Sequence, residues 1–288
     1  MHFCNLFKGE NMVEGEHTIE SNIVYGMYSG LALLMDAYKP NNPNGYGVIF
    51  ISGSGWRAPL EWNAEALKDG GQQRVYVPTL TAAGYTVFAI NHRALPRFVY
   101  PAAVEDARRA VRFVRHHANE YGIQPDRIGA KGGSSGGHLV SMLGLQDGAG
   151  DPNSEDPVEQ ESARVQCVVA RAAPVDFILR DKSTPFLDFE HPEPGDTSSE
   201  AYQRHVEASP ITYVTADAPP FLLLHGDADD TVHISQAEAM EKALQNAGTI
   251  VKFIRIPGGG HGPTFGNPEN APDYKGEMIT HLDTHLKV

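Results

Sequence analysis

The residue types best suited to catalysis in this chain are a serine set between glycines, an aspartate and a histidine, in that order. Residues 128–139, IGAKGGSSGGHL, contain a Gly-x-Ser-x-Gly motif between a short strand-like run and an apolar helical pattern. A strand, a sharp turn and a helix around this motif are typical of a nucleophile elbow. There the serine takes strained backbone angles, and glycines two places away leave room for the turn. The motif therefore predicts a nucleophilic serine.

The motif fits two registers. Gly132-x-Ser134-x-Gly136 makes Ser134 the nucleophile, and the frame one residue later makes it Ser135. The alternative for such a motif in isolation is a phosphate-binding loop or a flexible turn, and the strand and helix patterns on its flanks disfavour that interpretation. Spacing alone leaves the choice between the two serines open.

A serine hydroxyl needs a base to take its proton, and a carboxylate must hold that base in one tautomer. When the serine lies on an elbow of this kind, the carboxylate follows it along the chain and the histidine comes last. A strand-like run at residues 221–225 leads into a turn with three aspartates, Asp227, Asp229 and Asp230. A second run, 251–256, leads into a glycine-flanked loop that contains His261. We therefore predict His261 as the base and an aspartate of the turn as the acid.

The other histidines have structural interpretations. His138 and His225 lie inside the motifs, and we expect them to brace loops by hydrogen bonding. His281 and His285 stand four residues apart on one face of a predicted C-terminal helix. Without a third ligand, or the glutamate of a metalloprotease motif, this pair is weak evidence for a metal. The sequence therefore predicts no metal site.

Short apolar runs alternate with helical patterns along the chain. This alternation indicates the α/β class, with a mostly parallel sheet flanked by helices. Buried strands are predicted at residues 47–52, 86–91, 165–171, 221–225 and 251–256, and an antiparallel strand at residues 31–37. Residues 103–121 predict a helix, because apolar residues recur every three or four positions. The arginines of this helix lie off the apolar stripe, on a face that we expect to be solvated.

Two polar segments interrupt the alternation. Residues 146–163 are acidic and rich in turn formers; they lack the regular ligand spacing of a calcium loop and predict a solvated surface loop. Residues 184–209 are polar, with proline and glycine interspersed. An insertion at this point usually lies over the carboxyl ends of the strands, where ligands bind. We predict one domain over residues 1–288, with residues 184–209 as a small cap.

The net charge of −13 disfavours nucleic acid or an anionic membrane as a partner, because phosphate binding requires clustered Lys and Arg. Two cysteines, Cys4 and Cys167, make neither a disulfide framework nor a cysteine zinc site. The N-terminal residues lack the apolar core of a signal peptide, and no run approaches the roughly 20 apolar residues of a membrane span. We expect a cytoplasmic protein, or a secreted one if a signal peptide has been removed. The oligomeric state is not indicated.

The elbow resembles the G-x-S-A-G-G-H-L segment of esterases in the hormone-sensitive-lipase and feruloyl-esterase-like branches of the α/β-hydrolases. Further similar segments follow the family's order: residues 101–107 (PAAVEDA), 121–128 (YGIQPDRI) and 208–211 (ASPI). Matching the two glycines and the histidine after the motif implies that Ser134 is the nucleophile. The turn at residues 225–232 (HGDADDTV) resembles the family's H-G-x-x-D-x-x-V and implies Asp229 as the acid, with Asp230 the nearest substitute.

The same resemblance implies an oxyanion hole. Residues 51–56, ISGSGW, stand where these families carry H-G-G-G-W, which implies backbone N–H donors from Ser54, Gly55 and Ser135. Two positions depart from the pattern: Ser52 replaces a histidine that braces the loop, and Ser54 adds a side chain beside the acyl group. Trp56 is a candidate for stacking on a substrate ring, as is Trp62, and core packing is the alternative for both.

The resemblance implies a serine carboxylesterase for short-acyl esters, with acetyl or feruloyl groups on plant polysaccharide as candidate substrates. The partner would then be a small-molecule or oligosaccharide ester, and no cofactor is implied. An amidase of the arylformamidase type is the second enzymatic hypothesis. A non-catalytic binding protein on the same fold is the third, and the presence of all three candidate triad residues argues against it.

Overall fold

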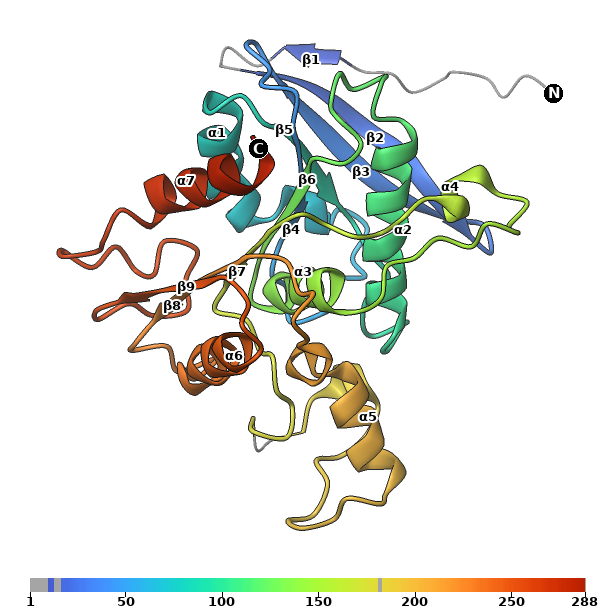
Figure 1. The fold of residues 1–288 in the computed structure, drawn as a ribbon. Coiled ribbons are helices and arrows are strands. Elements are labelled where there is room, and N and C mark those ends of the chain that lie inside the picture. Colours follow the sequence, from blue (N-terminus) through green and yellow to red (C-terminus); the bar gives the residue numbers. More distant parts are fainter. Residues whose placement is uncertain (1–9, 13–16, 181–182, 288) are drawn as a thin grey trace.

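The computed structural model of the chain describes residues 10–12, 17–180 and 183–287. Within these residues the strands form one nine-stranded sheet in the order β1-β2-β3-β5-β4-β6-β7-β8-β9 (Figure 1). The first three strands and the β3–β5 pair are antiparallel, and every pair from β5 to β9 is parallel. The strands are β1 (Glu10–Met12), β2 (His17–Tyr28), β3 (Leu31–Pro40), β4 (Gly47–Ile51), β5 (Thr86–Ile90), β6 (Ile128–Gly133), β7 (Val168–Arg171), β8 (Phe221–Gly226) and β9 (Val251–Ile256).

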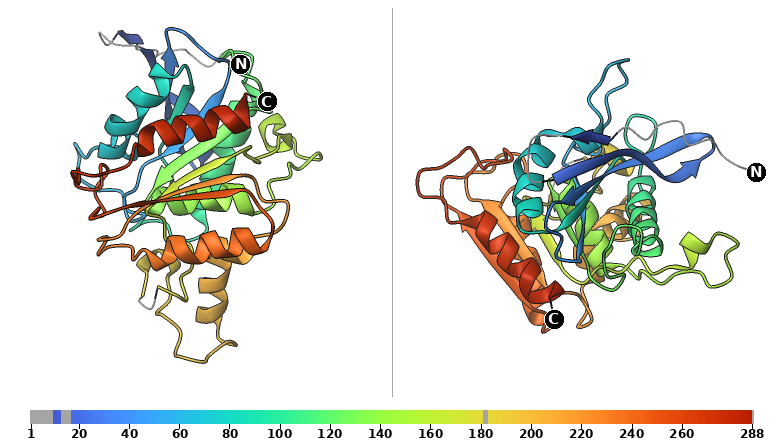
Figure 2. Two further views of the ribbon diagram at one scale, coloured as in Figure 1. Left: turned by 60° about the vertical axis from the view of Figure 1, so that its left-hand side comes forward. Right: turned by 90° about the horizontal axis from the view of Figure 1, so that it is seen from above.

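Helices cover both faces of the sheet. In chain order the described helices are η1 (Leu67–Asp69), α1 (Gly71–Ala82), α2 (Ala102–His116), α3 (Ser135–Leu145), α4 (Pro157–Gln160), η2 (Pro185–Leu187), α5 (Glu200–Ala208), η3 (Pro210–Tyr213), α6 (Ser235–Asn246) and α7 (Tyr274–Leu286). Figures 1 and 2 show α1 and α7 on one side of the sheet and α2 and α3 on the other. The predicted class, a mostly parallel sheet between helices, is confirmed.

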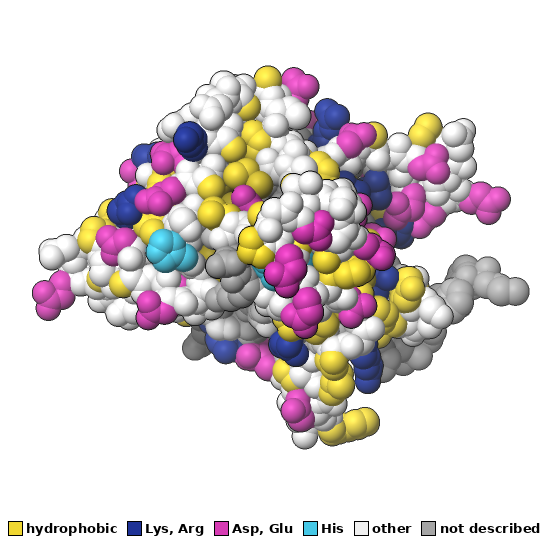
Figure 3. Space-filling view, turned by 90° about the horizontal axis from the view of Figure 1, so that it is seen from below, with side chains coloured by type: hydrophobic (Ala, Val, Ile, Leu, Met, Phe, Trp, Pro, Cys, Tyr) yellow, Lys and Arg dark blue, Asp and Glu magenta, His cyan; other side chains and the backbone are white. Residues whose placement is uncertain are grey.

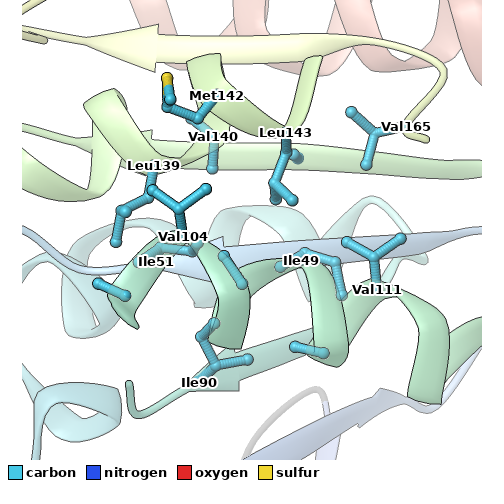
Figure 4. Close-up of a cluster of buried hydrophobic side chains, with 14 of the residues drawn as sticks. Ile49, Ile51, Ile90, Val104, Val111, Leu139, Val140, Met142, Leu143 and Val165 are labelled. Carbon is cyan, nitrogen blue, oxygen red and sulfur yellow. The ribbon is translucent and has the colours of Figure 1, made fainter. Parts of the chain in front are cut away.

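Alternate residues of the central strands build the two cores. Ile49 and Ile51 of β4 pack with apolar residues of α2 and α3, as Figure 4 shows. Val48 and Phe50, which alternate with them along the strand, pack with α1 and α7 on the opposite face. Because successive side chains of a strand point to opposite faces, a strand between two helical layers must be apolar throughout. This is why β4 is recognisable in the sequence as an unbroken apolar run, with all five residues buried.

The predicted elements agree with the structure except at their ends. β7 begins at Val168, three residues later than expected, and α2 ends at His116 rather than at residue 121. Residues after His116 continue as turns that keep Ala118 buried and set Tyr121 against Phe88, with ring centroids 4.9 Å apart. The apolar periodicity therefore persists past the last helical turn, which is why it overestimates the length of the helix.

The arginine face of α2 and the acidic loop at residues 146–163, each expected to face solvent, are in fact bound to each other. Arg109 of α2 pairs with Asp156 at 2.6 Å and with Glu159 at 2.8 Å, and Arg112 pairs with Glu159 at 2.7 Å. The acidic loop at residues 146–163 thus lies along α2, with the short helix α4 inside it. Opposite charges on segments that are distant in sequence explain both patterns, and the prediction of a solvated arginine face was wrong.

The segment at residues 184–209 extends away from the sheet and carries η2 and α5, seen at the lower end of Figure 1. Phe186 and Leu187 of η2 are buried, so the segment is packed against the body at its base.

Cys167 is buried and unpaired, and Cys4 lies outside the described residues. Within the described residues, no helix has the length and apolar character needed to cross a membrane.

The start of α2 is tied to the loop after β5 by a buried ion pair. Arg93 binds Asp106 through both its side chain, at 2.8 Å, and its backbone N–H, at 2.6 Å. Asp106 is 1% exposed, whereas Glu105, which pairs with the same guanidinium at 2.8 Å, has a side chain that is 57% exposed. The two neighbouring carboxylates therefore bind one arginine in different surroundings.

Asp106 and Glu105 allow a matched test of how burial of a carboxylate affects stability. Asp106→Ala leaves the buried Arg93 charge without its closest partner, and we expect a loss of about 3–5 kcal/mol in the free energy of unfolding. Glu105→Ala removes a largely exposed partner and should cost less than about 1 kcal/mol. Urea denaturation of both variants measures the difference. Equal losses would show that the burial of Asp106 does not set the stability of this junction.

Candidate active site

Ser134 lies at the tight turn between β6 and α3. Its backbone angles are φ 55° and ψ −126°, a region that side-chain-bearing residues rarely occupy. The turn is held from the neighbouring strand, because the Ser134 N–H donates to the carbonyl of Arg171 in β7 at 2.8 Å. The strand–turn–helix context expected from the motif is therefore present, and the strain lies at the predicted nucleophile.

Close backbone contacts explain the glycines at this turn. A Cβ on Gly132 would lie 2.2 Å from the carbonyl oxygen of Gly136, and one on Gly136 would lie 2.1 Å from that of Ile51. Gly53, in the loop after β4, would place a Cβ 2.7 Å from the Cβ of Ser134. None of these approaches allows a side chain. The elbow and the loop after β4 thus pack closely against each other at the carboxyl edge of the sheet.

The structure brings His261 between Ser134 and Asp229. His261 Nε2 is 2.8 Å from Ser134 Oγ, and His261 Nδ1 is 2.7 Å from Asp229 Oδ2. Since a carboxylate can only accept, Nδ1 carries the proton and Nε2 is free to accept one from the serine. Ser135 makes no such contact: its Oγ accepts a hydrogen bond from the Ser54 N–H at 2.9 Å. The geometry therefore favours the first of the two registers.

Asp229 is buried and well provided with donors. Its Oδ1 accepts from the N–H groups of Thr231 and Val232, each at 2.9 Å, and His225 Nε2 lies 3.5 Å from Oδ2. Burial alone would raise the pKa of Asp229, but hydrogen bonds from His225 and His261 outweigh it and hold the pKa well below its usual range. Asp227 and Asp230 are exposed on the same turn. The structure thus places an ionised carboxylate behind His261.

Two residues that sequence reasoning missed hold the loop that carries His261, by donating hydrogen bonds to its backbone carbonyls. The guanidinium of Arg171, which is fully buried, donates to the carbonyls of His261 and Gly262 and lies 4.8 Å from the ring centroid of Phe265. The Tyr76 hydroxyl donates to the carbonyl of Pro263 at 2.8 Å. Arg171 therefore binds the elbow through its own carbonyl and the histidine loop through its side chain.

A signal for Arg171 was present in the sequence. It is a charged residue that ends an otherwise apolar buried strand, at the same sheet edge as the serine. No comparable signal marks Tyr76, because its partner Pro263 is 187 residues away along the chain.

The predicted oxyanion donors lie beside the elbow. Ser54 and Gly55 belong to the loop after β4, and Ser135 is the first residue of α3. The hydrogen bond from the Ser54 N–H to Ser135 Oγ joins the two segments directly. A hydroxyl at position 135 thus braces the loop in this chain, where Ser52 replaces the histidine of similar sequences.

Trp56 lies in the interior, 4% exposed, rather than at an open surface. Its ring stacks on Phe186 with centroids 4.8 Å apart, and its Nε1 donates to His138 Nδ1 at 3.1 Å. Because Nδ1 accepts this bond, Nε2 of His138 carries the proton and donates to the carbonyl of Ala208 at 2.8 Å. Burial lowers the pKa of His138 to about 4, so it stays neutral. Both residues therefore join the loop after β4, α3 and α5, and no open stacking face remains on Trp56.

Comparison with solved structures places the fold among esterases. A truncated carbohydrate esterase from gut microbiota superposes with a TM-score of 0.79 and 30% identity, covering 96% of this chain and 99% of that one. A thermophilic esterase of Thermogutta terrifontis, Est2, gives a TM-score of 0.72 with 22% identity and covers 91% of each chain. The chain has the α/β-hydrolase fold of these proteins.

Curated relatives and a family model agree with this fold. The probable carboxylic ester hydrolase LipM of Mycobacterium tuberculosis is 32% identical over 250 residues, which are 84% of this chain and 56% of LipM. The esterase LipC of the same organism is 30% identical over 225 residues, 75% of this chain and 52% of LipC. The chain thus spans about half the length of these relatives. The BD-FAE family model matches residues 35–244, a range that includes Ser134 and Asp229 and ends before His261, and the chain belongs to the BD-FAE family.

Proposed function

We propose that this chain is a serine carboxylesterase that hydrolyses short-acyl esters through an acyl-enzyme. The observation that carries the proposal is the continuous hydrogen-bonded path from Ser134 Oγ through His261 to Asp229, with contacts of 2.8 and 2.7 Å. The resemblance to proteins named as carboxylic ester hydrolases and carbohydrate esterases supports it.

In the proposed mechanism Ser134 Oγ attacks the ester carbonyl carbon while His261 Nε2 takes the hydroxyl proton. The imidazolium that forms lies against the ionised Asp229, which stabilises its charge. His261 then gives the proton to the leaving alkoxide, and the alcohol departs. Water attacks the acyl-enzyme in the same way: His261 takes a proton from the water and returns it to Ser134 Oγ as the acid is released.

Negative charge on the carbonyl oxygen would be stabilised by the N–H groups of Ser54, Gly55 and Ser135. One such donor is worth roughly 3–4 kcal/mol in comparable sites. The Ser54 N–H is directed to Ser135 Oγ in this structure. On the proposed mechanism it turns to the oxyanion, or shares its hydrogen between the two oxygens, when the tetrahedral intermediate forms.

Esters of plant polysaccharide, acetyl or feruloyl, are the proposed natural substrates. Support comes from the carbohydrate esterase that this chain resembles at 30% identity. We propose residues 184–209 as a cap over the site, since Phe186 of η2 stacks on Trp56 in the loop next to the elbow. An amide substrate would use the same residues, and no contact in the structure favours it.

The first prediction tests the register of the elbow with p-nitrophenyl acetate. Ser134→Ala removes the nucleophile, and we expect kcat/KM to fall by at least about 10⁴-fold. Ser135→Ala keeps its backbone N–H and loses one bracing hydrogen bond, so activity should stay within about tenfold of the parent. The reverse pattern would assign the chemistry to Ser135.

The second prediction distinguishes the aspartates of one turn. Asp229→Asn removes the charge behind His261 and favours the wrong tautomer, which should lower kcat by about 10³- to 10⁴-fold. Asp230→Asn, at an exposed neighbour, should change kcat by less than about threefold. Steady-state kinetics of the two variants, with circular dichroism to confirm folding, gives the comparison. Similar losses in both would remove Asp229 from its assigned role.

The third prediction concerns the length of the acyl chain. The side chain of Ser54 lies in the segment proposed to flank the acyl group, so long acyl chains should fit poorly. We expect kcat/KM to fall about tenfold or more from p-nitrophenyl butyrate to the octanoate. Ser54→Gly should narrow that difference. A parent enzyme that prefers octanoate would contradict the short-acyl assignment.

A further inference from the structure

The two tryptophans of this chain lie in opposite surroundings. Trp56 is 4% exposed, whereas Trp62 is 97% exposed. Trp62 belongs to the connection between β4 and α1, which projects from the body of the molecule in the right-hand view of Figure 2. Leu60, on the same connection, is 56% exposed. In Figure 3 the lower projection carries hydrophobic side chains at its outer end. Large apolar side chains gathered on an exposed projection indicate a surface that binds something.

This connection contributes to a pocket of about 460 Å³ beside the proposed oxyanion loop. Its lining includes Gly53 and Ser54 of the proposed oxyanion loop and Arg57, Pro59 and Leu67 of the connection. A Cβ on Gly53 would lie 2.7 Å from the Cβ of Ser134, so the loop after β4 lies between this pocket and the proposed nucleophile and borders both. One half of an ester bound at Ser134 can therefore extend along this pocket toward Trp62.

The base of the connection is held by backbone hydrogen bonds. The Ala58 N–H donates to the carbonyl of Leu95 at 3.0 Å, and the Leu95 N–H donates to the carbonyl of Trp56 at 2.8 Å. Trp56 is itself fixed by His138 and Phe186. The pocket wall is thus attached to the same framework that positions the elbow, and its distance from Ser134 is set by the fold.

The polar groups of the pocket suit hydroxyls better than an anion. Arg57 is exposed and forms no ion pair within the described ranges, so its donors are open to a ligand. Glu65 lines the same pocket and pairs with Arg74 at 2.6 Å, and Glu61 flanks Trp62. Glu61 adds a negative charge next to Trp62 in the chain, which disfavours a negatively charged ligand. An aromatic face with a donor and acceptors beside it matches a sugar ring, whose C–H face is apolar and whose edge carries hydroxyls.

We propose that the pocket and Trp62 form a subsite for a neutral pyranose ring on the alcohol side of the scissile ester, with Arg57 donating to its hydroxyls. The subsite rests on the proposed esterase function and names its substrate class, an O-acylated neutral oligosaccharide. The acyl group lies at the oxyanion hole, and the sugar chain leaves the site along the connection between β4 and α1.

Kinetics on substrates with one acyl group and different alcohols tests the subsite. We expect Trp62→Ala to lower the ratio of kcat/KM for acetylated xylotriose to that for ethyl acetate by about tenfold. Trp62→Phe retains an aromatic face and should keep the ratio within about threefold of the parent. Ile250→Ala changes another exposed apolar residue, 61% exposed and next to the amino end of β9, and serves as the control.

Two results would overturn the subsite. One is an unchanged ratio in Trp62→Ala, whether neither acetate or both lose activity equally. The other is a loss confined to p-nitrophenyl acetate, assayed as a third substrate, which would assign the surface to an aryl alcohol.

Binding without turnover separates this proposal from the proposed esterase function. In the Ser134→Ala variant, unsubstituted xylotriose should change the tryptophan emission and protect it from acrylamide, because Trp62 is the exposed one of only two tryptophans. Adding Trp62→Phe should abolish this signal, since Trp56 is buried. No change in emission or quenching up to about 50 mM xylotriose would refute the subsite, whether or not the parent hydrolyses esters.

Discussion

The close approach of the turn at Ser134 to the loop after β4 is the constraint on which the rest of the site depends. Gly136 lies so near the carbonyl of Ile51 that a Cβ would be 2.1 Å from that oxygen, and a Cβ on Gly53 would lie 2.7 Å from the Cβ of Ser134. The proposed nucleophile and oxyanion loop are therefore positioned together by these close contacts and by the hydrogen bond from the Ser54 N–H to Ser135 Oγ. The cost is a serine with positive φ, which persists because β6, β7 and α3 fix both sides of the turn.

Arg171 extends this framework to the histidine. Its carbonyl accepts from the Ser134 N–H in the sheet, and its guanidinium binds two carbonyls of the loop that carries His261. One buried residue thus positions the proposed base relative to the proposed nucleophile, although the two are 127 residues apart along the chain. Burial lowers the pKa of this guanidinium, although the two carbonyl acceptors and the face of Phe265 favour its charged form.

Sequence reasoning identified the parts of this site that depend on local geometry. Glycine spacing around Ser134 and an unbroken apolar run at β4 both follow from rules that operate within a few residues. The choice between Ser134 and Ser135 was not available from spacing, because both frames satisfy the same glycine rule. The 2.8 Å distance from His261 to Ser134 favours the first frame, and that distance depends on the whole sheet. Arg109 and its partner Asp156 likewise meet only in three dimensions. The sequence alone also does not distinguish Trp56 from Trp62; the structure does, because Trp56 is buried and Trp62 is exposed.

The central claim is that Ser134 is the residue that His261 activates. The most direct measurement is active-site labelling with a fluorophosphonate, followed by mass spectrometry of the peptide that contains residues 131–139. The account predicts one adduct per chain, located on Ser134, retained in Ser135→Ala and lost in His261→Ala. An adduct on Ser135, or labelling that persists without the imidazole, would contradict it.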